Sequence, residues 1–256
     1  MPLDSSSFFL SSPLLIRLPV IKIGILWVFL FLLLTGTHAV DAQDSTTRRE
    51  FWPEVDVYIT VKPKVRLYLT GTISKTVEDG ELRDAQGYEG QIGVHVDYIP
   101  NKHVILRAGY RYGTAVGNNS DPFKEHRLLT EQTLRHLLPG DLLLSDRNRE
   151  DFRFVNGDFS FRYRNRVTLE REVHLFKGRS ITPYVSGEIF YDTRYNTWNR
   201  NRFAVGVQQS LRSGPLRKML LPERQIILDL YYMRQNDSRS DIPHVNAIGA
   251  ALAFYF

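Results

Sequence analysis

The chain has 256 residues, a formal net charge of +5 and no cysteine. Without cysteine there is no disulfide framework, thiolate zinc site, cysteine nucleophile or lipid-modified N-terminal cysteine. Hydrophobic residues make up 43% of the chain, which argues against disorder, and the interspersed charges contain no nucleic-acid-binding motif.

Residues 1–42 have the layout of a secretory signal peptide. Arg17 and Lys22 supply positive charge, and a twelve-residue apolar run follows at 23–34. Two small-x-small cleavage candidates come next, the second ending at Ala42. A spanning helix needs ~20 mostly apolar residues, and the two basic residues interrupt any longer run. Cleavage after Ala42 is therefore favoured over membrane anchoring.

Residues 43–256, the expected folded domain, contain many segments in which apolar and polar residues alternate. This period of two is typical of strands with two unlike faces. Most segments have 10 to 13 residues, more than the ~5–6 of globular sheets and close to the ~9–11 of a tilted membrane strand. The alternation is clearest at 55–62, 65–73, 91–98, 103–112, 159–169, 181–191, 202–211, 224–234 and 246–256.

Alternation alone does not distinguish a soluble barrel with an apolar interior from a membrane barrel with an apolar outer wall. Three features favour the membrane barrel: the secretion signal, the terminal Phe256, and aromatic residues near strand ends. These aromatic residues are Tyr98, Tyr110, Tyr112, Tyr191, Tyr231 and Tyr232. We therefore expect an all-β, transmembrane, antiparallel up-and-down barrel. A soluble periplasmic barrel that binds an apolar ligand is the alternative.

Turn chemistry and strand parity give an expected strand number. Eleven alternating segments are counted, but bacterial single-chain barrels usually have even numbers. Treating 55–74 as one strand kinked at Pro63 gives about ten strands, and one missed strand would give twelve. With a periplasmic C-terminus, short turns fall inside and longer polar loops outside. The expected inner turns are at Pro100, Pro139 and 214–222, and the expected outer loops are 75–87, 113–124, 193–201 and 237–243.

The terminal segment 246–256 (NAIGAALAFYF) resembles the closing strand of bacterial outer-membrane proteins. That resemblance implies that Phe254 and Phe256 are read by the barrel-assembly machinery. Further segments are similar to a family of outer-membrane β-barrel proteins of unknown function: FWPEVDVY (51–58), GVHVDY (93–98), RAGYRY (107–112), RYRNR (162–166) and EIF (188–190). The resemblance covers most of the chain after residue 42. It implies a barrel in the outer membrane of a Gram-negative bacterium and no established activity.

The stretch 126–172 holds nine arginines and eight acidic residues. One interpretation is a lumen filled with cross-strand ion pairs, because small barrels are filled by side chains. The other is an arginine ladder that selects anions along a pore. Nearly equal charge numbers favour the first. The candidate lumenal charge ladder is Arg107, Arg111, Arg127, Glu131, Arg135, Arg147, Arg149, Arg162, Arg164, Arg166, Glu170 and Glu188.

The segment 142–154 does not fit the lipid-facing pattern. The parity that starts with Leu144 continues as Asp146, Asn148 and Glu150. Charges that face lipid at the midplane cost ~2–4 kcal/mol for Arg or Lys and less for acids. Two explanations stay open: this strand runs above the membrane, or a bulge switches its faces.

Catalytic and metal-binding motifs are not found. His95 and Asp97 share a face, where a lumenal hydrogen bond is a simpler reading than a catalytic pair. His126 and His136 lie ten residues apart, too far for one metal on a strand, and no HExxH occurs. A further pair of equal parity, Glu188 and Asp192, is ordinary for lumenal carboxylates facing arginines. We expect no enzyme activity, no metal and no cofactor.

The sequence therefore favours a non-enzymatic outer-membrane barrel, either a structural envelope protein or a narrow, porin-like pore for small solutes. Its expected partners are outer-membrane lipids and the assembly machinery, not nucleic acid, and the oligomeric state is left open. The alternative from a different class is a lipid-modifying enzyme, similar to a phospholipase or lipid A deacylase, that uses His95 or His126.

Overall fold

The computed structural model describes residues 47–78, 81–83, 89–115, 124–175, 180–211, 225–238 and 244–256. The expected signal peptide and its cleavage site at Ala42 lie outside these residues, as do most of the loop at 113–124 and the turn at 214–222. Among the described residues, no helix has the length and apolar character needed to cross a membrane.

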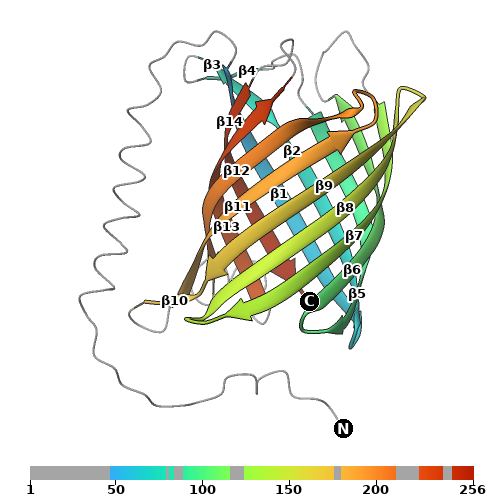
Figure 1. Ribbon diagram of the computed structural model, residues 1–256. Helices are drawn as coiled ribbons and strands as arrows, with labels where there is room; N and C mark the ends of the chain where they lie inside the picture. Colours follow the sequence, from blue (N-terminus) through green and yellow to red (C-terminus); the bar gives the residue numbers. More distant parts are fainter. Residues whose placement is uncertain are drawn as a thin grey trace, which may run out of the picture. The chain divides into compact units, whose positions relative to one another are not determined.

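Eleven strands form a closed cylinder in which each strand pairs with its neighbours in chain order (Figure 1). They are β1 (Thr47–Lys62), β2 (Val65–Ile73), β5 (Glu89–Asn101), β6 (Val104–Ala115), β7 (Lys124–Leu138), β8 (Leu142–Val155), β9 (Asp158–Arg171), β11 (Ser180–Asp192), β12 (Thr197–Ser210), β13 (Gln225–Asp237) and β14 (His244–Tyr255). The short strands β3 (Lys75–Glu78), β4 (Glu81–Arg83) and β10 (Val173–His174) lie outside this sequence of eleven. The expected transmembrane-type, up-and-down barrel is confirmed.

The seam that closes the cylinder is parallel. β1 and β14 pair from Thr47 opposite His244 to Tyr58 opposite Tyr255, whereas every other pair is antiparallel. An odd number of alternating strands brings the first and last strands together in the same direction. β1 therefore starts at one rim, here called the N-terminal rim, and β14 ends at the other, the C-terminal rim.

The expected single strand over 55–74 is wrong, and with it the count of ten. β1 and β2 form a hairpin around Pro63 and Lys64, with Tyr58 opposite Tyr68. Proline lacks the N–H that a ladder position requires, and the chain reverses there instead of kinking. The eleven segments counted in the sequence correspond to eleven separate strands.

Two tight turns carry the backbone geometry that their sequences predict. Asn156 and Gly157 join β8 to β9 with φ of 51° and 98°. Positive φ at both central residues defines the type I′ turn, which matches the twist of antiparallel strands and favours Asn-Gly. Gly140 and Asp141, with φ of 80° and 60°, turn the chain from β7 into β8 at the C-terminal rim.

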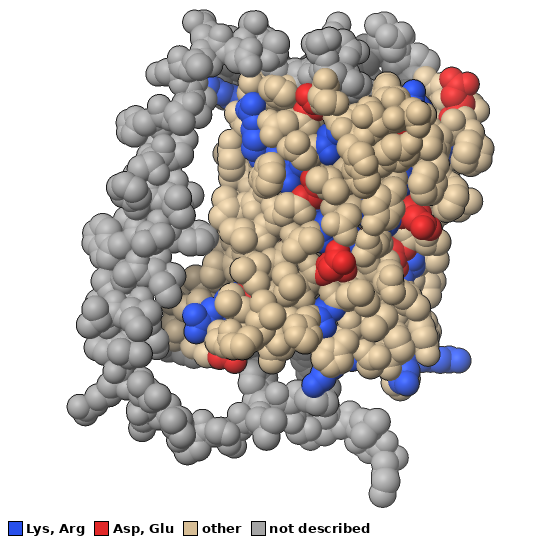
Figure 2. Space-filling model, in the orientation of Figure 1, with Lys and Arg blue, Asp and Glu red and all other residues tan. Residues whose placement is uncertain are grey.

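The two faces of the wall differ in chemistry, and the apolar face is outside. Ile92, Phe203 and Ile248 are each about 60% exposed or more, and residues other than Lys, Arg, Asp and Glu (tan) cover most of the barrel face shown in Figure 2. The alternate positions point inward and carry polar or charged side chains: His95 and Asp97 are 1% and 0% exposed. This arrangement is the reverse of a soluble barrel and matches the membrane barrel.

β8 departs from this rule without the expected bulge. It crosses the whole wall and pairs in continuous register with β7 and β9, with no bulge. Arg149 and Asp151 are therefore buried inside, while Asp146, Asn148 and Glu150 lie on the outer face. The expected face-switching bulge is therefore wrong.

Candidate functional site

The interior of the barrel is a dense network of ion pairs, here called the lumenal network. Its most connected acid is Glu188 of β11, whose side chain is 2% exposed. Arg164 donates from Nε and Nη2 to Oε1 at 3.1 and 2.8 Å, and Arg166 donates to Oε2 at 2.9 Å. Arg147 reaches Oε1 at 3.2 Å, and Arg202 lies 3.8 Å from Oε2. One carboxylate therefore links guanidinium groups from β8, β9 and β12.

Asp192, at the N-terminal rim end of β11, is the second centre of the network. Its fully buried carboxylate receives Arg162 at 3.0 Å and Arg153 at 3.2 Å. Arg194, in the turn after β11, donates its backbone and side-chain N–H groups to the same carboxylate at 3.0–3.1 Å. Burial lowers the pKa of Arg194, but the hydrogen bonds and charge of Asp192 outweigh it and raise that pKa above its usual value.

Arg153 connects this centre to a third carboxylate. It binds both oxygens of Glu125 and also reaches Asp192, so one guanidinium links β7, β8 and β11. Arg127 completes the group, with Nη2 at 2.8 Å from Glu125. A guanidinium that bridges two carboxylates fixes three strands at once, because its N–H groups are held in a rigid planar fork.

The opposite side of the lumen combines ion pairs with stacked rings. Tyr255, Tyr58, Tyr68 and His95 lie directly opposite one another on four neighbouring strands and stack at centroid distances of 4.6, 4.6 and 4.9 Å. Asp97 receives Arg66 at 2.7 Å and Arg107 at 2.6 Å. These guanidiniums lie over the rings of Tyr58 and Tyr68 at 4.5 and 4.1 Å, which adds cation–π attraction.

The structure brings most residues of the predicted charge ladder together. Arg107, Arg127, Glu131, Arg147, Arg149, Arg162, Arg164, Arg166 and Glu188 all take part in ion pairs within the lumen. Arg111 instead donates to His95 Nε2 at 3.3 Å. Arg135 and Glu170 share the inward parity near the C-terminal rim, where neither forms an ion pair with another described residue.

Several members of the network are absent from the predicted charge ladder. Arg66 and Arg202 lie outside the arginine-rich stretch 126–172, and so do Glu125 and Asp97 as ion-pair acceptors. The sequence does contain a signal for them, because each occupies one of the polar positions that alternate with the apolar positions of its strand. Asp151, inside the stretch, is fully buried and receives Arg149 at 2.7 Å.

The histidines considered for catalysis or metal binding are not brought together. His95 lies inside, stacked on Tyr68, whereas His126 lies on the outer face with Nδ1 2.6 Å from the hydroxyl of Tyr110. Neither histidine forms a hydrogen bond or ion pair with a described carboxylate. Among the described residues, no group of three or more histidine and acidic side chains is arranged to hold a metal ion. The interior is therefore built to pack and pair charges.

A closed cylinder with an apolar outer wall and a charged interior defines this chain as an outer-membrane-type β-barrel. The chain belongs to the family described as "Protein of unknown function (DUF2490)", whose model matches residues 49–246. The expected resemblance to a barrel family of unknown function is thereby confirmed. No curated protein matches this chain.

Solved structures that resemble this chain are outer-membrane barrels. LpxR from Salmonella typhimurium matches with a TM-score of 0.50 and 7% identity, over 78% of this chain and 87% of that chain. The beta domain of the Bordetella autotransporter Brka matches with a TM-score of 0.45 and 16% identity, over 75% and 82%. At 7% identity, the likeness to LpxR indicates a common fold only.

Proposed function

We propose that the protein is a structural outer-membrane barrel whose lumen is closed, so that it neither conducts solutes nor catalyses a reaction. The supporting observation is the packing of the interior. Asp97, Asp151 and Asp192 face the middle of the cylinder, yet their side chains have 0% exposure. A water-filled pore would leave such carboxylates hydrated. The ion pairs occupy the cross-section instead.

The same packing argues against an anion-selective pore. Selectivity by charged rings requires cations that face the permeation path. Here Arg153 spans from β8 to β11 to bind Asp192, and Arg147 makes the same crossing to bind Glu188. These cations are neutralised by carboxylates two strands away in the same wall, and their buried side chains lie in the space that an anion would need.

Conductance in planar bilayers tests this proposal. The wild type is expected to give no discrete steps at low or high KCl concentration. A matched variant, Arg149→Ala with Arg164→Ala and Phe190→Ala, removes three buried lumenal side chains. This variant is expected to conduct, and it shows that the assay detects an opened lumen. Salt-dependent steps from the wild type would refute the closed lumen.

Outer-membrane location belongs to the same proposal, with a signal peptide cleaved after Ala42 and with assembly directed by Phe254 and Phe256. The apolar wall and polar interior support membrane insertion over a soluble periplasmic barrel. Membrane fractionation tests the location, and N-terminal sequencing of the processed chain tests cleavage after Ala42. Gel mobility with and without heating tests whether a closed barrel has assembled. Recovery of the folded chain in detergent-free aqueous extracts would contradict the location.

The alternative, a lipid-modifying enzyme, has one structural observation in its favour. The Tyr110–His126 pair lies on the outer face, where a histidine base could meet lipid. Fatty-acid release from phospholipid or lipopolysaccharide by the purified barrel decides between the two. Release abolished by His126→Ala and retained by His136→Ala, on the same strand, would replace the structural proposal. We expect no release from the wild type.

A further inference from the structure

A polar patch interrupts the apolar outer wall at β7, β8 and β9. It consists of Thr130, Gln132, Asp146, Asn148, Glu150 and Asn165, here called the outer polar patch. On β8 it lies between Leu144 towards one rim and Phe152 towards the other, which places it at mid-height in the wall. Polar groups at this depth are costly against lipid and are usually satisfied by protein.

The patch is only partly satisfied by its own hydrogen bonds. Thr130 donates to Glu150 Oε2 at 2.9 Å, and Asn165 donates to Asp146 Oδ1 at 2.6 Å. No described lysine or arginine pairs with either carboxylate, so both keep unused acceptor sites. Gln132 has the complementary property, because its amide makes no hydrogen bond with a described residue and leaves two donors free.

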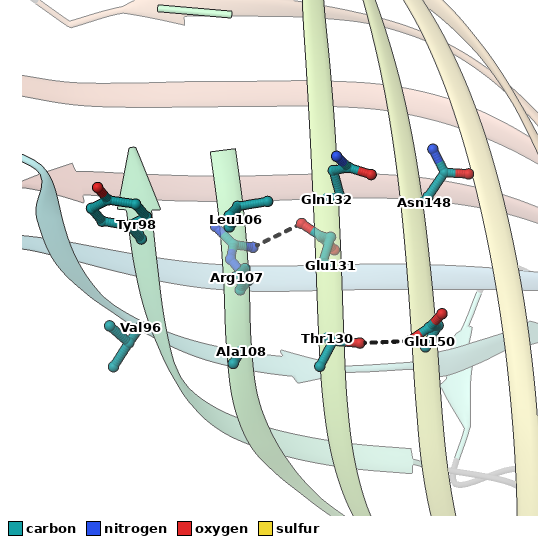
Figure 3. A pocket seen from close by; sticks show the side chains of 10 residues that line it. All are labelled: Val96, Tyr98, Leu106, Arg107, Ala108, Thr130, Glu131, Gln132, Asn148 and Glu150. Atoms are coloured by element: carbon teal, nitrogen blue, oxygen red, sulfur yellow. Dashed lines mark hydrogen bonds and ion pairs between the residues drawn. The ribbon is translucent and has the colours of Figure 1, made fainter. Parts of the chain in front are cut away.

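The patch also borders a hollow of about 550 Å³ in the outer wall. Two rows of residues in register across β5–β8 line it (Figure 3), Val96–Ala108–Thr130–Glu150 and Tyr98–Leu106–Gln132–Asn148. The β5 and β6 half of each row is apolar, and the β7 and β8 half is polar. The unused donor and the unused acceptors therefore lie on neighbouring strands, with an apolar depression beside them.

We propose that the outer polar patch joins two copies of this chain in the membrane. The copies are related by a two-fold axis that is parallel to the barrel axis and passes between β7 and β8. This symmetry places β7 of each copy against β8 of the other. The free amide of Gln132 then faces the carboxylates Asp146 and Glu150 of the second copy, and the carboxylates of the two copies are not directly opposed.

The surfaces on either side of this β7–β8 contact are both apolar and can pack against each other. The same axis brings the apolar side of the hollow, with Val96 and Leu106, against the β9 and β11 side of the second copy. That side presents Val167 and Val185, which are 44% and 48% exposed. At mid-membrane depth a water-soluble partner is excluded, and association there depends on close packing and hydrogen bonds. A second copy supplies both. The inference does not depend on whether the lumen is closed.

Cysteine cross-linking in native outer membranes tests the interface, since the chain has no cysteine of its own. Leu128→Cys is on β7, beside the proposed axis and outside the patch. It is expected to give a cross-linked dimer with a short bismaleimide, which spans the ~10 Å between packed sheets that a disulfide cannot bridge. Ile248→Cys on β14, an equally lipid-facing position at 62% exposure on the far side of the wall, is the matched control. No dimer from Leu128→Cys, equal dimer from both variants, or a product with a different protein would overturn the proposal.

A second variant tests whether the carboxylates of the patch join the two copies or are simply exposed to lipid. Asp146→Leu with Glu150→Leu, combined with Leu128→Cys, is expected to lower the cross-linked fraction at least fivefold while the barrel keeps its heat-modifiable gel mobility. Leucine suits a lipid-facing wall, so this pair of substitutions retains the fold. Undiminished cross-linking in a barrel that is still folded would show that the carboxylates do not join the copies.

Discussion

Tyr231 and Gly249 lie directly opposite each other on β13 and β14, and a β-carbon at position 249 would lie 1.9 Å from the Cζ atom of Tyr231. The tyrosine ring therefore occupies the space above the glycine. Its neighbours on the inner face of β14, Ala247 and Ala251, are also small. The small residues of the terminal segment make room for rings from the adjacent strands, which their sequence alone does not reveal.

Gly249→Ala is expected to destabilise the barrel by about 1–3 kcal/mol, the usual cost of overpacking a filled interior. Urea unfolding of the reconstituted protein, followed by tryptophan fluorescence, measures the change. Gly71→Ala is the control, because a β-carbon there meets nothing within 4 Å. Equal unfolding midpoints for the two variants would contradict the role of the ring.

Glu188→Gln is expected to lower the free energy of unfolding by about 3–5 kcal/mol, because removal of one partner of a buried charge pair leaves the rest uncompensated. Glutamine preserves shape and leaves the surrounding guanidiniums without their shared negative charge. Glu172→Gln, at a side chain that is 41% exposed, is expected to stay within about 0.5 kcal/mol of the wild type. A similar small effect at Glu188 would mean that other lumenal acids compensate.

An epitope tag inserted immediately before Thr47 is expected to face the opposite side of the membrane from a tag in the turn between Pro63 and Lys64. The parallel seam places these positions at opposite rims. Antibody labelling of intact and permeabilised cells measures this, with a tag between Lys102 and His103 as a second marker of the C-terminal rim. Labelling of the Thr47 and Lys64 positions from the same side would exclude the eleven-strand topology.

Phe256→Ala is expected to reduce the amount of barrel in the outer membrane and to leave refolding in vitro unchanged. The backbone of Phe256 is bound to β1 through Thr60 and Tyr58 at 3.0 and 2.8 Å, and these bonds survive loss of the ring. Quantitative blotting of membrane fractions, set beside refolding yields from urea, separates recognition from stability. Phe203→Ala, at an outward-facing phenylalanine, is the control and is expected to assemble normally.

Strand positions, faces and tight turns were predictable from the sequence because they depend on local patterns. The alternation around His95 and Asp97 gives the correct inward set, and Asn156-Gly157 gives its turn. The preference of bacterial barrels for even strand numbers does not hold here, because the chain reverses direction at Pro63 and Lys64. Tyr231 was also expected near an interface, but it faces inward, because the parity of β13 places it above Gly249.

Some partners within the lumenal network could not be predicted, because they join strands that are not adjacent. Parity shows that Arg153 points inward, but not that it reaches across to Asp192. The outward position of Asp146 and Glu150 follows from simple alternation. This outward position conflicts with the free-energy cost of exposing single carboxylates to lipid. A neighbouring protein surface that covers the two carboxylates would lower this cost.

The parallel seam has a consequence for the timing of barrel formation. Every other strand pair can form as a local hairpin between consecutive segments, but Thr47 meets His244 only after the whole intervening chain has been laid down. Such a long-range contact carries the largest loop-closure entropy and is slow to form. Until it forms, two strand edges remain unpaired, so we expect the pairing of β1 with β14 to be the last step of barrel formation.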